Sequence, residues 1–354
     1  MGRTMERKQA NPRRPGRRSV IVGGLLAAAA LGLPARRGVA AQDVNVWSTT
    51  DRLMADPLIE DFERRHPGLR VDYRQLGSVE LAERFAAEEG READVVWSSA
   101  MDLQVKLVND GHAARHLSRH AAALPRWAVW KHEAYATTSE PVGIAYHRGL
   151  WAEPELPRTH AALAALLQAE RQRFDQRVAS YDVERSGLGY LLAAQDSLAT
   201  PQYWTLVRAL GACRAVLQAD TGSMLEDIAA GRTLLAYNVL GSYVEAAARA
   251  RPELAIVYPR DYTLLAARVA FVARSAPHPD AARAWLDHLI SPRGQQVLAS
   301  DCGLTPVLPG AGAAPRLGEA ARPIGIGPGL LVHLDRSKRG AFIARWRHRY
   351  AGTG

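Results

Sequence analysis

Three short segments with the pattern of a β-strand, each followed by serine or threonine and then by a helical pattern, constrain the fold of this chain most strongly. The segments are 44–47, 69–73 and 94–97, and the hydroxyl side chains that follow them are Ser48, Thr49, Thr50, Ser78, Ser98 and Ser99. Ser and Thr are preferred at the N-cap, the residue that precedes the first helical turn. Strand and helix that alternate in this way predict a parallel α/β sheet.

The same six hydroxyl side chains form the first candidate site. The carboxyl ends of parallel strands meet at one edge of an open α/β sheet, and ligands bind at that edge. A helix N-terminus also presents free backbone N–H groups and a partial positive charge, which favour an anion. We therefore expect these side chains to contribute to an anion site. The alternative is that each hydroxyl only caps its own helix.

The rest of the chain continues the alternation of strand and helix. Further strands are expected at 141–147, 233–238, 254–258 and 264–273, and helices at 160–170, 188–196, 202–217, 223–230, 243–250, 279–290, 293–300 and 342–350. The segment 264–273 is apolar almost throughout, which is typical of a buried strand. Residues 308–329 are rich in Gly and Pro and predict a long irregular connection.

The first 41 residues have the pattern of an export signal. A basic segment ends with Arg-Arg-Ser at 17–19, apolar residues and glycine fill 20–33, and small residues follow at 38–41. The apolar stretch is too short to span a bilayer as a stable helix, so a cleaved signal peptide is favoured over an uncleaved anchor. The paired arginines favour twin-arginine export over the general route. We therefore expect a periplasmic protein.

Removal of this segment changes the charge and leaves enough chain for two domains. The full chain has a net charge of +9, but residues 1–41 carry nine basic side chains and one acid, a net of +8, which leaves +1. No nucleic-acid partner is therefore expected. The roughly 313 remaining residues exceed the usual size of one hydrophobic core, so two domains are predicted. Cys213 and Cys302 are too few for a disulfide scaffold, and the sequence leaves open whether they pair.

A series of short motifs runs through the chain in a characteristic order. It begins with Ser-Thr-Thr-Asp at 48–51, His-Pro-Gly at 66–68 and Asp-Val-Val-Trp-Ser-Ser-Ala-Met-Asp-Leu-Gln at 94–104. It continues with Pro-Val-Gly-Ile-Ala-Tyr at 141–146, Ala-Tyr-Asn at 236–238, Tyr-Pro at 258–259, Asp-Tyr-Thr-Leu at 261–264 and the segment 281–296. In this order the motifs resemble family 1 extracellular solute-binding proteins of ABC importers, in the ferric-iron-type and organophosphate-type branch. The resemblance covers about 43–308, most of the mature chain.

The resemblance implies a type II periplasmic binding fold, in which two α/β lobes are joined by two crossing hinge strands and the solute binds between the lobes. The segments 142–147 and 264–273 correspond to the hinge strands. Lobe one would consist of 42–141 plus 265–354, and lobe two of 142–264. Further solute contacts would come from Tyr146, Ser186, Gly187, Tyr237, Asn238, Gly241, Ser242, Asp261, Tyr262 and Thr263.

The residues of the second lobe argue against iron as the solute. Ferric binders of the resembled type use phenolate oxygens, commonly from an adjacent pair of tyrosines. The corresponding stretch, 237–243, reads Tyr-Asn-Val-Leu-Gly-Ser-Tyr and has no such pair. Ser, Thr, Asn and backbone N–H donors suit phosphate or carboxylate oxygens instead. We expect no metal site and no cofactor.

The expected function is that of the periplasmic substrate-binding component of an ABC transporter, which captures a small anionic solute by hinge closure. The resemblance favours an organophosphate such as a sugar phosphate, a phosphoglycerate or a phosphonate. The expected partners are this solute and an ABC permease at the inner membrane, and the protein is expected to be a monomer.

Three alternatives stay open: a ferric-iron importer component, a periplasmic sensor for a two-component kinase, and an exported hydrolase. The sequence has no Gly-x-Ser-x-Gly, His-Glu-x-x-His or phosphate-loop motif, so no catalytic residue is assigned and an enzyme is not expected.

Overall fold

Two mixed β-sheets organise the part of the chain that the computed structural model describes, which is residues 42–151, 156–313 and 315–352. The predicted signal peptide, 1–41, lies outside the described residues. None of the helices in the described residues is long and apolar enough to cross a membrane.

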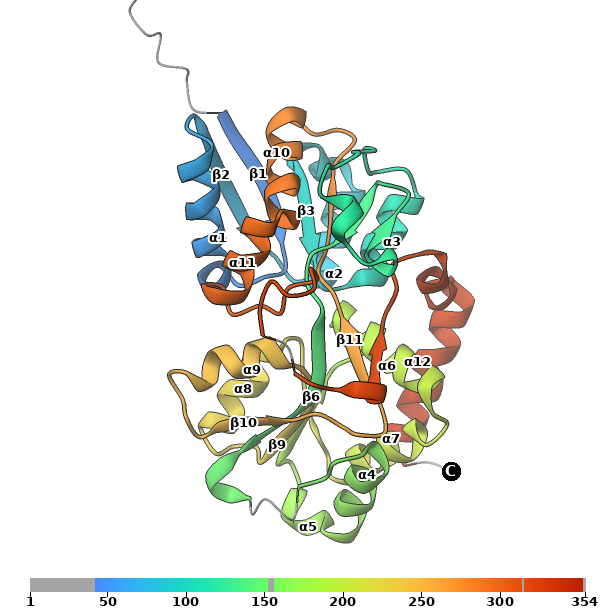
Figure 1. The fold of residues 1–354 in the computed structure, drawn as a ribbon. Coiled ribbons are helices and arrows are strands. Elements are labelled where there is room, and N and C mark those ends of the chain that lie inside the picture. The colour runs from blue at the N-terminus through green and yellow to red at the C-terminus, as the bar shows by residue number, and fades with distance from the viewer. Residues whose placement is uncertain (1–41, 152–155, 314, 353–354) are drawn as a thin grey trace, which may run out of the picture. The chain divides into compact units, whose positions relative to one another are not determined.

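The first sheet confirms the parallel sheet predicted from the three strand–hydroxyl–helix units. Its order is β2-β1-β3-β12-β5-β4, and β1 pairs in parallel with both β2 and β3. Its strands are β1 (Gln42–Ser48), β2 (Leu69–Gln75), β3 (Val95–Ser98), β4 (Val129–Trp130), β5 (Ala134–Ala136) and β12 (Val269–Val272). The helices of this half are α1 (Arg52–Arg65), α2 (Ser78–Ala86), α3 (Met101–Asn109), α10 (Pro279–Ile290) and α11 (Pro292–Ser300) (Figure 1).

Burial explains why the first sheet forms from these residues. Every residue of β3 is buried, as expected for a central strand with helices on both faces. The apolar stripe of α1 places Phe62 in the core, where its ring meets that of Trp285 of α10 edge-on at 5.0 Å. On α2, the ring of Phe85 packs on Phe271 of β12 at 5.5 Å. These contacts hold α1, α2 and α10 on the sheet.

The second sheet has the order β13-β11-β6-β9-β7-β8, with β10 also paired to β6. Its strands are β6 (Glu140–His147), β7 (Val178–Tyr181), β8 (Val216–Gln218), β9 (Leu235–Leu240), β10 (Leu254–Val257), β11 (Thr263–Ala266) and β13 (Ala321–Pro323). The remaining α-helices are α4 (His160–Ala169), α5 (Arg171–Phe174), α6 (Gly187–Ala199), α7 (Tyr203–Ala212), α8 (Thr221–Ala229), α9 (Gly241–Ala248) and α12 (Arg336–Tyr350).

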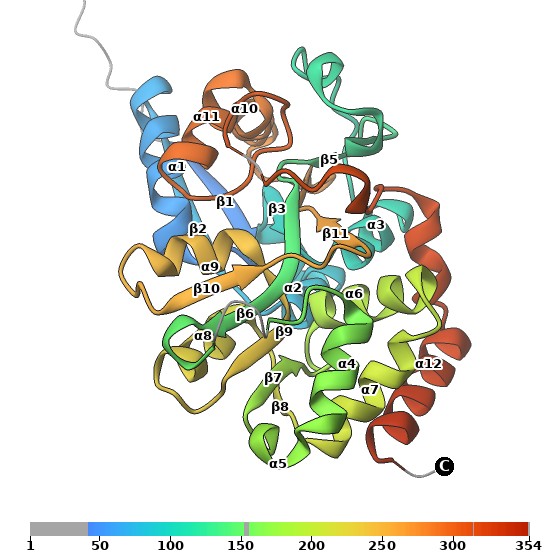
Figure 2. The ribbon, with the colours of Figure 1, turned by 60° about the horizontal axis from the view of Figure 1, so that its bottom comes forward.

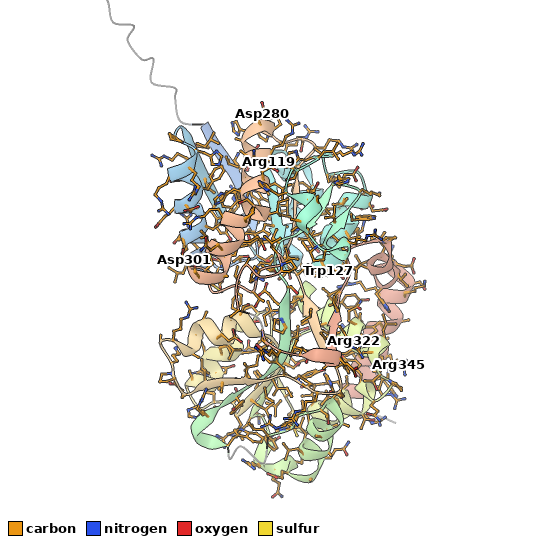
Figure 3. The ribbon with its side chains drawn as sticks, viewed as in Figure 1. Arg119, Trp127, Asp280, Asp301, Arg322 and Arg345 are labelled. Atoms are coloured by element: carbon orange, nitrogen blue, oxygen red, sulfur yellow. The ribbon has the colours of Figure 1, made fainter. Side chains whose placement is uncertain are left out.

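Short 3₁₀ helices connect several of these elements. They are η1 (Glu88–Glu92), η2 (Ala121–Ala123), η3 (Arg126–Ala128), η4 (Arg148–Leu150), η6 (Gly318–Ala320) and η7 (Pro328–His333). The last two lie in or beside the connection 308–329, which the sequence predicted to be irregular and which also contains the short strand β13. The connection is fixed to the first half by a hydrogen bond from the backbone N–H of Ile326 to the carbonyl of Trp127 (3.0 Å; Trp127 is labelled in Figure 3).

The chain passes between the two sheets twice, which confirms the prediction of two α/β lobes joined by two crossings. The predicted first hinge strand, 142–147, lies instead within β6 of the second sheet. The first passage leads from β5 through 137–139 to β6, and the second from β11 to β12. The sequence predicted one strand over 264–273, but Ala267 and Arg268 interrupt it. The backbone N–H of Ala267 faces the sulfur of Met101 (3.3 Å), and that of Arg268 donates to the Thr138 hydroxyl (2.8 Å). The strand therefore changes sheets at these two residues.

The C-terminal helix packs on helices of the second half. Trp346 of α12 donates its ring N–H to the Tyr203 hydroxyl of α7 (3.2 Å), and Phe342 meets the Tyr190 ring of α6 at 5.4 Å. Figure 2 shows α12 alongside α7. The sequence assigned 265–354 to lobe one. The limits of the two lobes stay a prediction.

Two details of the sequence-based description are resolved by the structure. The helix predicted at 202–217 ends at Ala212, because Arg214 has a φ of 47°, in the left-handed region that a helix cannot contain, and β8 follows. Cys213 and Cys302 are both buried and do not form a disulfide. They belong to separate apolar clusters.

Candidate functional site

A cavity of about 630 Å³ lies between residues of the two sheets. The first half contributes Thr49, Asp51, Gln75, Leu76, Gly77, Ser78, Glu80 and Ser99. The second half contributes Tyr181, Arg185, Ser186, Leu188, Ala219, Asp220, Thr221, Gly222, Leu240 and Tyr243. Arg268, from the second crossing between the sheets, completes the wall.

Four of the residues predicted to bind the solute line this cavity: Thr49, Ser78, Ser99 and Ser186. The Thr49 hydroxyl accepts a hydrogen bond from the backbone N–H of Ser99 (3.1 Å), which joins the ends of β1 and β3. The Ser186 hydroxyl accepts from the N–H of Gly189 (3.1 Å) and caps α6. The parallel strands thus bring hydroxyl groups to one edge, as their sequence positions predict.

Ser78, which lines the cavity, contacts Gly187 of the second half directly. The Ser78 hydroxyl accepts a hydrogen bond from the backbone N–H of Gly187 at 2.9 Å. Ser78 begins α2 and Gly187 begins α6, so the contact joins the two halves at their helix N-termini.

Three other predicted hydroxyl residues are buried behind the cavity wall. The Ser48 hydroxyl accepts from the N–H of Thr50 (3.0 Å), and the Ser98 hydroxyl accepts from the N–H of Ala100 (3.2 Å). The Thr50 hydroxyl accepts from Nε of Arg268 (2.8 Å). In the structure these side chains shape the strand-to-helix turns.

Two predicted residues lie at the start of α9, also outside the cavity lining. The Ser242 hydroxyl donates to the carboxylate of Glu140. Gly241 is enclosed by the Tyr258 hydroxyl and the carbonyl oxygen of Pro141, so that an added Cβ would collide with the first and press on the second (3.0 Å). Close packing of α9 on β6 explains the glycine at this position.

Tyr237, Asn238 and Tyr262 form a separate buried cluster around the carboxylate of Asp196. The Tyr237 hydroxyl and the Asn238 amide both donate to one oxygen (2.7 Å each), and the Tyr262 hydroxyl donates to the other (3.0 Å). His160 stacks on the Tyr262 ring at 4.0 Å. None of these side chains lines the cavity between the sheets.

The remaining predicted residues also lie away from the cavity. Asp261 pairs with Nδ1 of His160 (3.0 Å), and the Thr263 hydroxyl donates to the carbonyl of Pro259 (2.7 Å). Tyr146 is buried in the apolar cluster of the second half. The resemblance placed Asp261 and Thr263 near the return hinge and Tyr146 within a strand, but the sequence could not show which way their side chains point.

Burial keeps the tyrosines of this cluster protonated. Burial raises the pKa of Asp196 above its usual value, and burial together with the adjacent Asp196 raises the pKa of Tyr237 well above 10. The same causes raise the pKa of Tyr262. These phenols therefore donate to Asp196 at neutral pH and do not supply phenolate oxygens.

Arg268 and Tyr243 are the main residues of the cavity wall that sequence reasoning missed. The Arg268 side chain is 1% exposed and forms an ion pair with Glu140. Burial lowers the pKa of Arg268, but Glu140, Tyr243 and Tyr73 together outweigh burial and raise this pKa above its usual value. Tyr243 places its ring 5.4 Å from the guanidinium carbon, and burial raises the pKa of its hydroxyl to about 12. A single arginine within the apolar run 264–273 was the available signal for this site.

The N-termini of six helices converge on the cavity. Residues within two positions of the starts of α1, α2, α3, α6, α8 and α9 line it. The first turn of each helix has backbone N–H groups without an intrahelical acceptor. Such ends attract negative charge through the helix dipole.

The charged side chains of the wall have both signs. Arg185 and Arg268 face the cavity together with Asp51, Glu80 and Asp220. Asp220 is occupied in capping α8, where it accepts from the N–H of Ser223 (2.8 Å), and Asp51 accepts from the Gln75 amide (2.6 Å). Within the described residues, no three His, Cys, Asp or Glu side chains are grouped to hold a metal ion.

The family model of bacterial extracellular solute-binding proteins matches residues 44–301. The chain belongs to this family, which confirms the resemblance seen in its sequence and places the protein outside the cytoplasm. A substrate-binding protein of an ABC transporter from Agrobacterium tumefaciens is 34% identical over 88% of this chain and 94% of that one, with a TM-score of 0.83. No curated protein sequence matches the chain.

More distant solved structures share the fold. Iron-bound HitA from Pseudomonas aeruginosa is 16% identical over 87% of this chain and 99% of that one, with a TM-score of 0.68. The periplasmic binding protein AfuA from Actinobacillus pleuropneumoniae, with fructose 6-phosphate bound, is 15% identical over 88% and 99%, with a TM-score of 0.70. These two proteins hold different solutes on one fold, so the fold alone does not identify the solute.

Proposed function

We propose that this protein is the periplasmic solute-binding component of an ABC importer and captures a small anionic solute in the cavity between its two lobes. The observation that carries the proposal is the convergence of six helix N-termini on that cavity. Side chains already accept from some of the first-turn N–H groups, in α1, α6 and α8. The N–H groups that remain, together with the helix dipoles, favour an anion without a full positive charge nearby. The Agrobacterium tumefaciens relative, a substrate-binding protein of an ABC transporter, supports the importer role.

An organophosphate is the solute class that we propose. The hydroxyl groups of Thr49, Ser78 and Ser99 and the guanidinium of Arg268 suit phosphate oxygens. AfuA, which shares the fold, holds fructose 6-phosphate and supports a sugar phosphate. A phosphoglycerate or a phosphonate offers the same chemistry.

Ferric iron is the second candidate, because HitA shares the fold and holds iron. Two tyrosines, Tyr181 and Tyr243, line the cavity. Burial raises the pKa of both hydroxyls, which disfavours the phenolate form that a ferric ion needs. Tyr237 points into the cluster around Asp196 instead. These observations favour an organic anion over iron.

The proposed mechanism is capture by closure of the hinge. A solute that contacts both halves of the cavity binds the closed state better than the open one, and so shifts the population towards closure. The passages 137–139 and 267–268 are the connections about which the halves would move. The closed form would then dock on an ABC permease, and the solute would be released unchanged.

A thermal-shift screen tests the proposed solute class. The panel contains inorganic phosphate, fructose 6-phosphate, glucose 6-phosphate, 3-phosphoglycerate, a phosphonate and ferric citrate. A rise of several degrees with one or more phosphorus compounds supports the proposal. A rise with ferric citrate alone, together with a visible tyrosinate-to-iron absorption band, would overturn it. Release of phosphate from a bound ester would replace the transport role with that of a hydrolase.

Export is proposed to depend on residues 1–41 acting as a twin-arginine signal. The test is the size and location of the protein in cells that express Arg17→Lys with Arg18→Lys. We expect the unprocessed precursor to accumulate in the cytoplasm. Normal processing of this variant would favour the general export route.

A further inference from the structure

Arg268 lies where the chain crosses between the two sheets, and it also borders the cavity. Its guanidinium is held from both halves. Nε donates to the hydroxyl of Thr50, next to the end of β1 in the first sheet, at 2.8 Å. Nη1 pairs with the carboxylate of Glu140, the first residue of β6 in the second sheet.

The backbone of Arg268 ties the two crossings together. Its carbonyl accepts from the N–H of Thr137 (2.8 Å), and its N–H donates to the Thr138 hydroxyl (2.8 Å). Glu140 accepts two further hydrogen bonds, from the hydroxyl of Thr138 (2.9 Å) and from that of Ser242 at the start of α9. One buried network therefore contains both crossings, the end of β1 and the N-terminus of α9.

The arrangement leaves Arg268 capacity for a further acceptor. A guanidinium carries five N–H groups in a planar fork. The contacts to Thr50 and Glu140 use two of them, and the Tyr243 side chain, which lies over the guanidinium, is a third partner. Thr49 and Ser99, which line the same cavity, add hydroxyl groups that can donate to the same anion. The other arginine of the cavity wall, Arg185, is exposed and so is screened by solvent.

The ion pair between Arg268 and Glu140 makes this part of the cavity wall neutral overall. Arg268 and Glu140 together are neutral, and both side chains are 1% exposed. Buried ion pairs are often no more stabilising than apolar residues of the same volume. Stability alone therefore does not explain why this ion pair is present, whereas a contribution of Arg268 to solute binding does.

We propose that Arg268 binds the anionic group of the solute and that Glu140 is its resident counter-charge, so that the solute's charge is recognised at the hinge itself. This inference rests on the proposed function, because it requires an anionic solute in this cavity. The inference adds two points to the proposed function. Arg268 is the residue that selects for an anionic solute, and the solute is oriented with its anionic end at the crossing between the sheets.

The test compares the signs of two changes in affinity. Isothermal titration calorimetry with fructose 6-phosphate and with inorganic phosphate measures the dissociation constant for the unchanged protein, Arg268→Gln and Glu140→Gln. We expect Arg268→Gln to weaken binding by about 30-fold or more, because a buried partner of the anion is lost. We expect Glu140→Gln to tighten binding by about fivefold, because a negative charge near the anion is removed.

A structural role alone gives a different pattern. Both single variants break a buried ion pair and lower the free energy of unfolding, so stability does not distinguish the two roles. Affinities within twofold of the unchanged protein for both variants, or changes of the same sign, would overturn the inference. The control is Arg293→Gln, which breaks the pair with buried Asp61 away from the cavity and should lower stability without changing affinity.

A double variant covers the case in which a single variant does not fold. Glu140→Gln combined with Arg268→Met removes both charges at similar volume, and such replacements of buried pairs are tolerated. We expect it to fold and to bind fructose 6-phosphate at least about tenfold more weakly. Unchanged binding by this variant would overturn the inference and leave the proposed function standing. Absence of binding by the unchanged protein to every anion in the panel would overturn both.

Discussion

The backbone N–H of Gly187 donates to the Ser78 hydroxyl at 2.9 Å and joins the first turns of α6 and α2 directly. A Cβ added at Gly187 would lie 2.8 Å from Cδ1 of Leu103, 3.0 Å from the Ser78 oxygen and 3.2 Å from Cβ of Ala100. The glycine therefore permits a closer approach of the two halves than a larger residue allows.

Gly187→Val is expected to weaken solute binding by opposing closure. Leu103 can rotate to accept the single methyl of alanine, but the branched valine side chain collides with Ala100 and Ser78 as well. We expect at least about tenfold weaker binding of fructose 6-phosphate, which corresponds to 1.4 kcal/mol. Small-angle scattering should show that the radius of gyration no longer falls when the sugar phosphate is added.

Gly340→Ala is the matched control for this substitution. Gly340 lies within α12, and an added Cβ there meets no atom within 4 Å. Alanine should raise the free energy of unfolding by about 0.5–1 kcal/mol through its helix propensity and leave affinity unchanged. If Gly187→Val closes and binds as the unchanged protein does, the contact with Ser78 is not part of closure.

Ser99→Leu is expected to abolish binding while the protein stays folded. Ser99 is 8% exposed and lines the cavity, where it lies next to Thr49. A leucine side chain would fill space that the solute needs and would remove a hydroxyl donor. Titration calorimetry should detect no heat with inorganic phosphate or fructose 6-phosphate, and the far-ultraviolet circular dichroism should be unchanged. Retained affinity would place the solute elsewhere.

Asn238→Leu is expected to reduce stability instead. Asn238 has a φ of 67°, in the left-handed region, where leucine costs about 1 kcal/mol more than asparagine. Its amide also donates to the buried carboxylate of Asp196, and loss of that donor costs about 1–3 kcal/mol. Urea unfolding should show a total loss of about 2–4 kcal/mol.

Asn238→Gly separates the two contributions. Glycine adopts the left-handed region without strain, so this variant loses the hydrogen bond and the buried side chain but gains no backbone strain. We expect it to be more stable than Asn238→Leu by about 1 kcal/mol. Equal stability of the two variants would show that the backbone conformation contributes nothing.

The edge of the first sheet could be predicted from sequence because its cause is local. Strand–hydroxyl–helix order brings Thr49 and Ser99 together through parallel pairing, and the structure has both in the cavity wall. Ser48 and Ser98 lie one residue earlier on the same strands and face the turn. A change of one residue reverses the direction of a strand side chain, and spacing in the sequence does not fix that direction.

The second half was less predictable because its site depends on contacts between distant segments. Tyr237 and Asn238 were expected at the end of a strand over 233–238, but β9 continues to Leu240, and Asp196, some 40 residues away, draws both side chains into the core. Arg268 pairs with Glu140 at a separation of 128 residues. No local pattern contains either partner, so only the fold shows which polar residues face the cavity.

Asp102 gives the structure a pH dependence that can be measured. It lies in the first turn of α3, is 2% exposed, and accepts from the backbone N–H of Leu103 (2.9 Å). Burial raises the pKa of Asp102 from 3.8 to about 7. The folded state therefore binds this proton more tightly than the unfolded state does.

Asp102→Asn is expected to stabilise the protein at pH 8 and to flatten its stability profile. Since the pKa of the folded state is the higher one, stability from this group is fully present below pH 4 and is lost as pH rises towards 7. At pH 8 the free energy of unfolding is lower by an amount on the order of 4 kcal/mol. Asparagine does not ionise, so Asp102→Asn avoids this loss. Urea unfolding at pH 5, 6, 7 and 8 measures this difference in the free energy of unfolding.

Asp280→Asn, at an exposed position labelled in Figure 3, is the control and should change stability by no more than about 0.5 kcal/mol. A parallel decline of the Asp102→Asn protein and the unchanged protein between pH 5 and 8 would assign the pH dependence to another group.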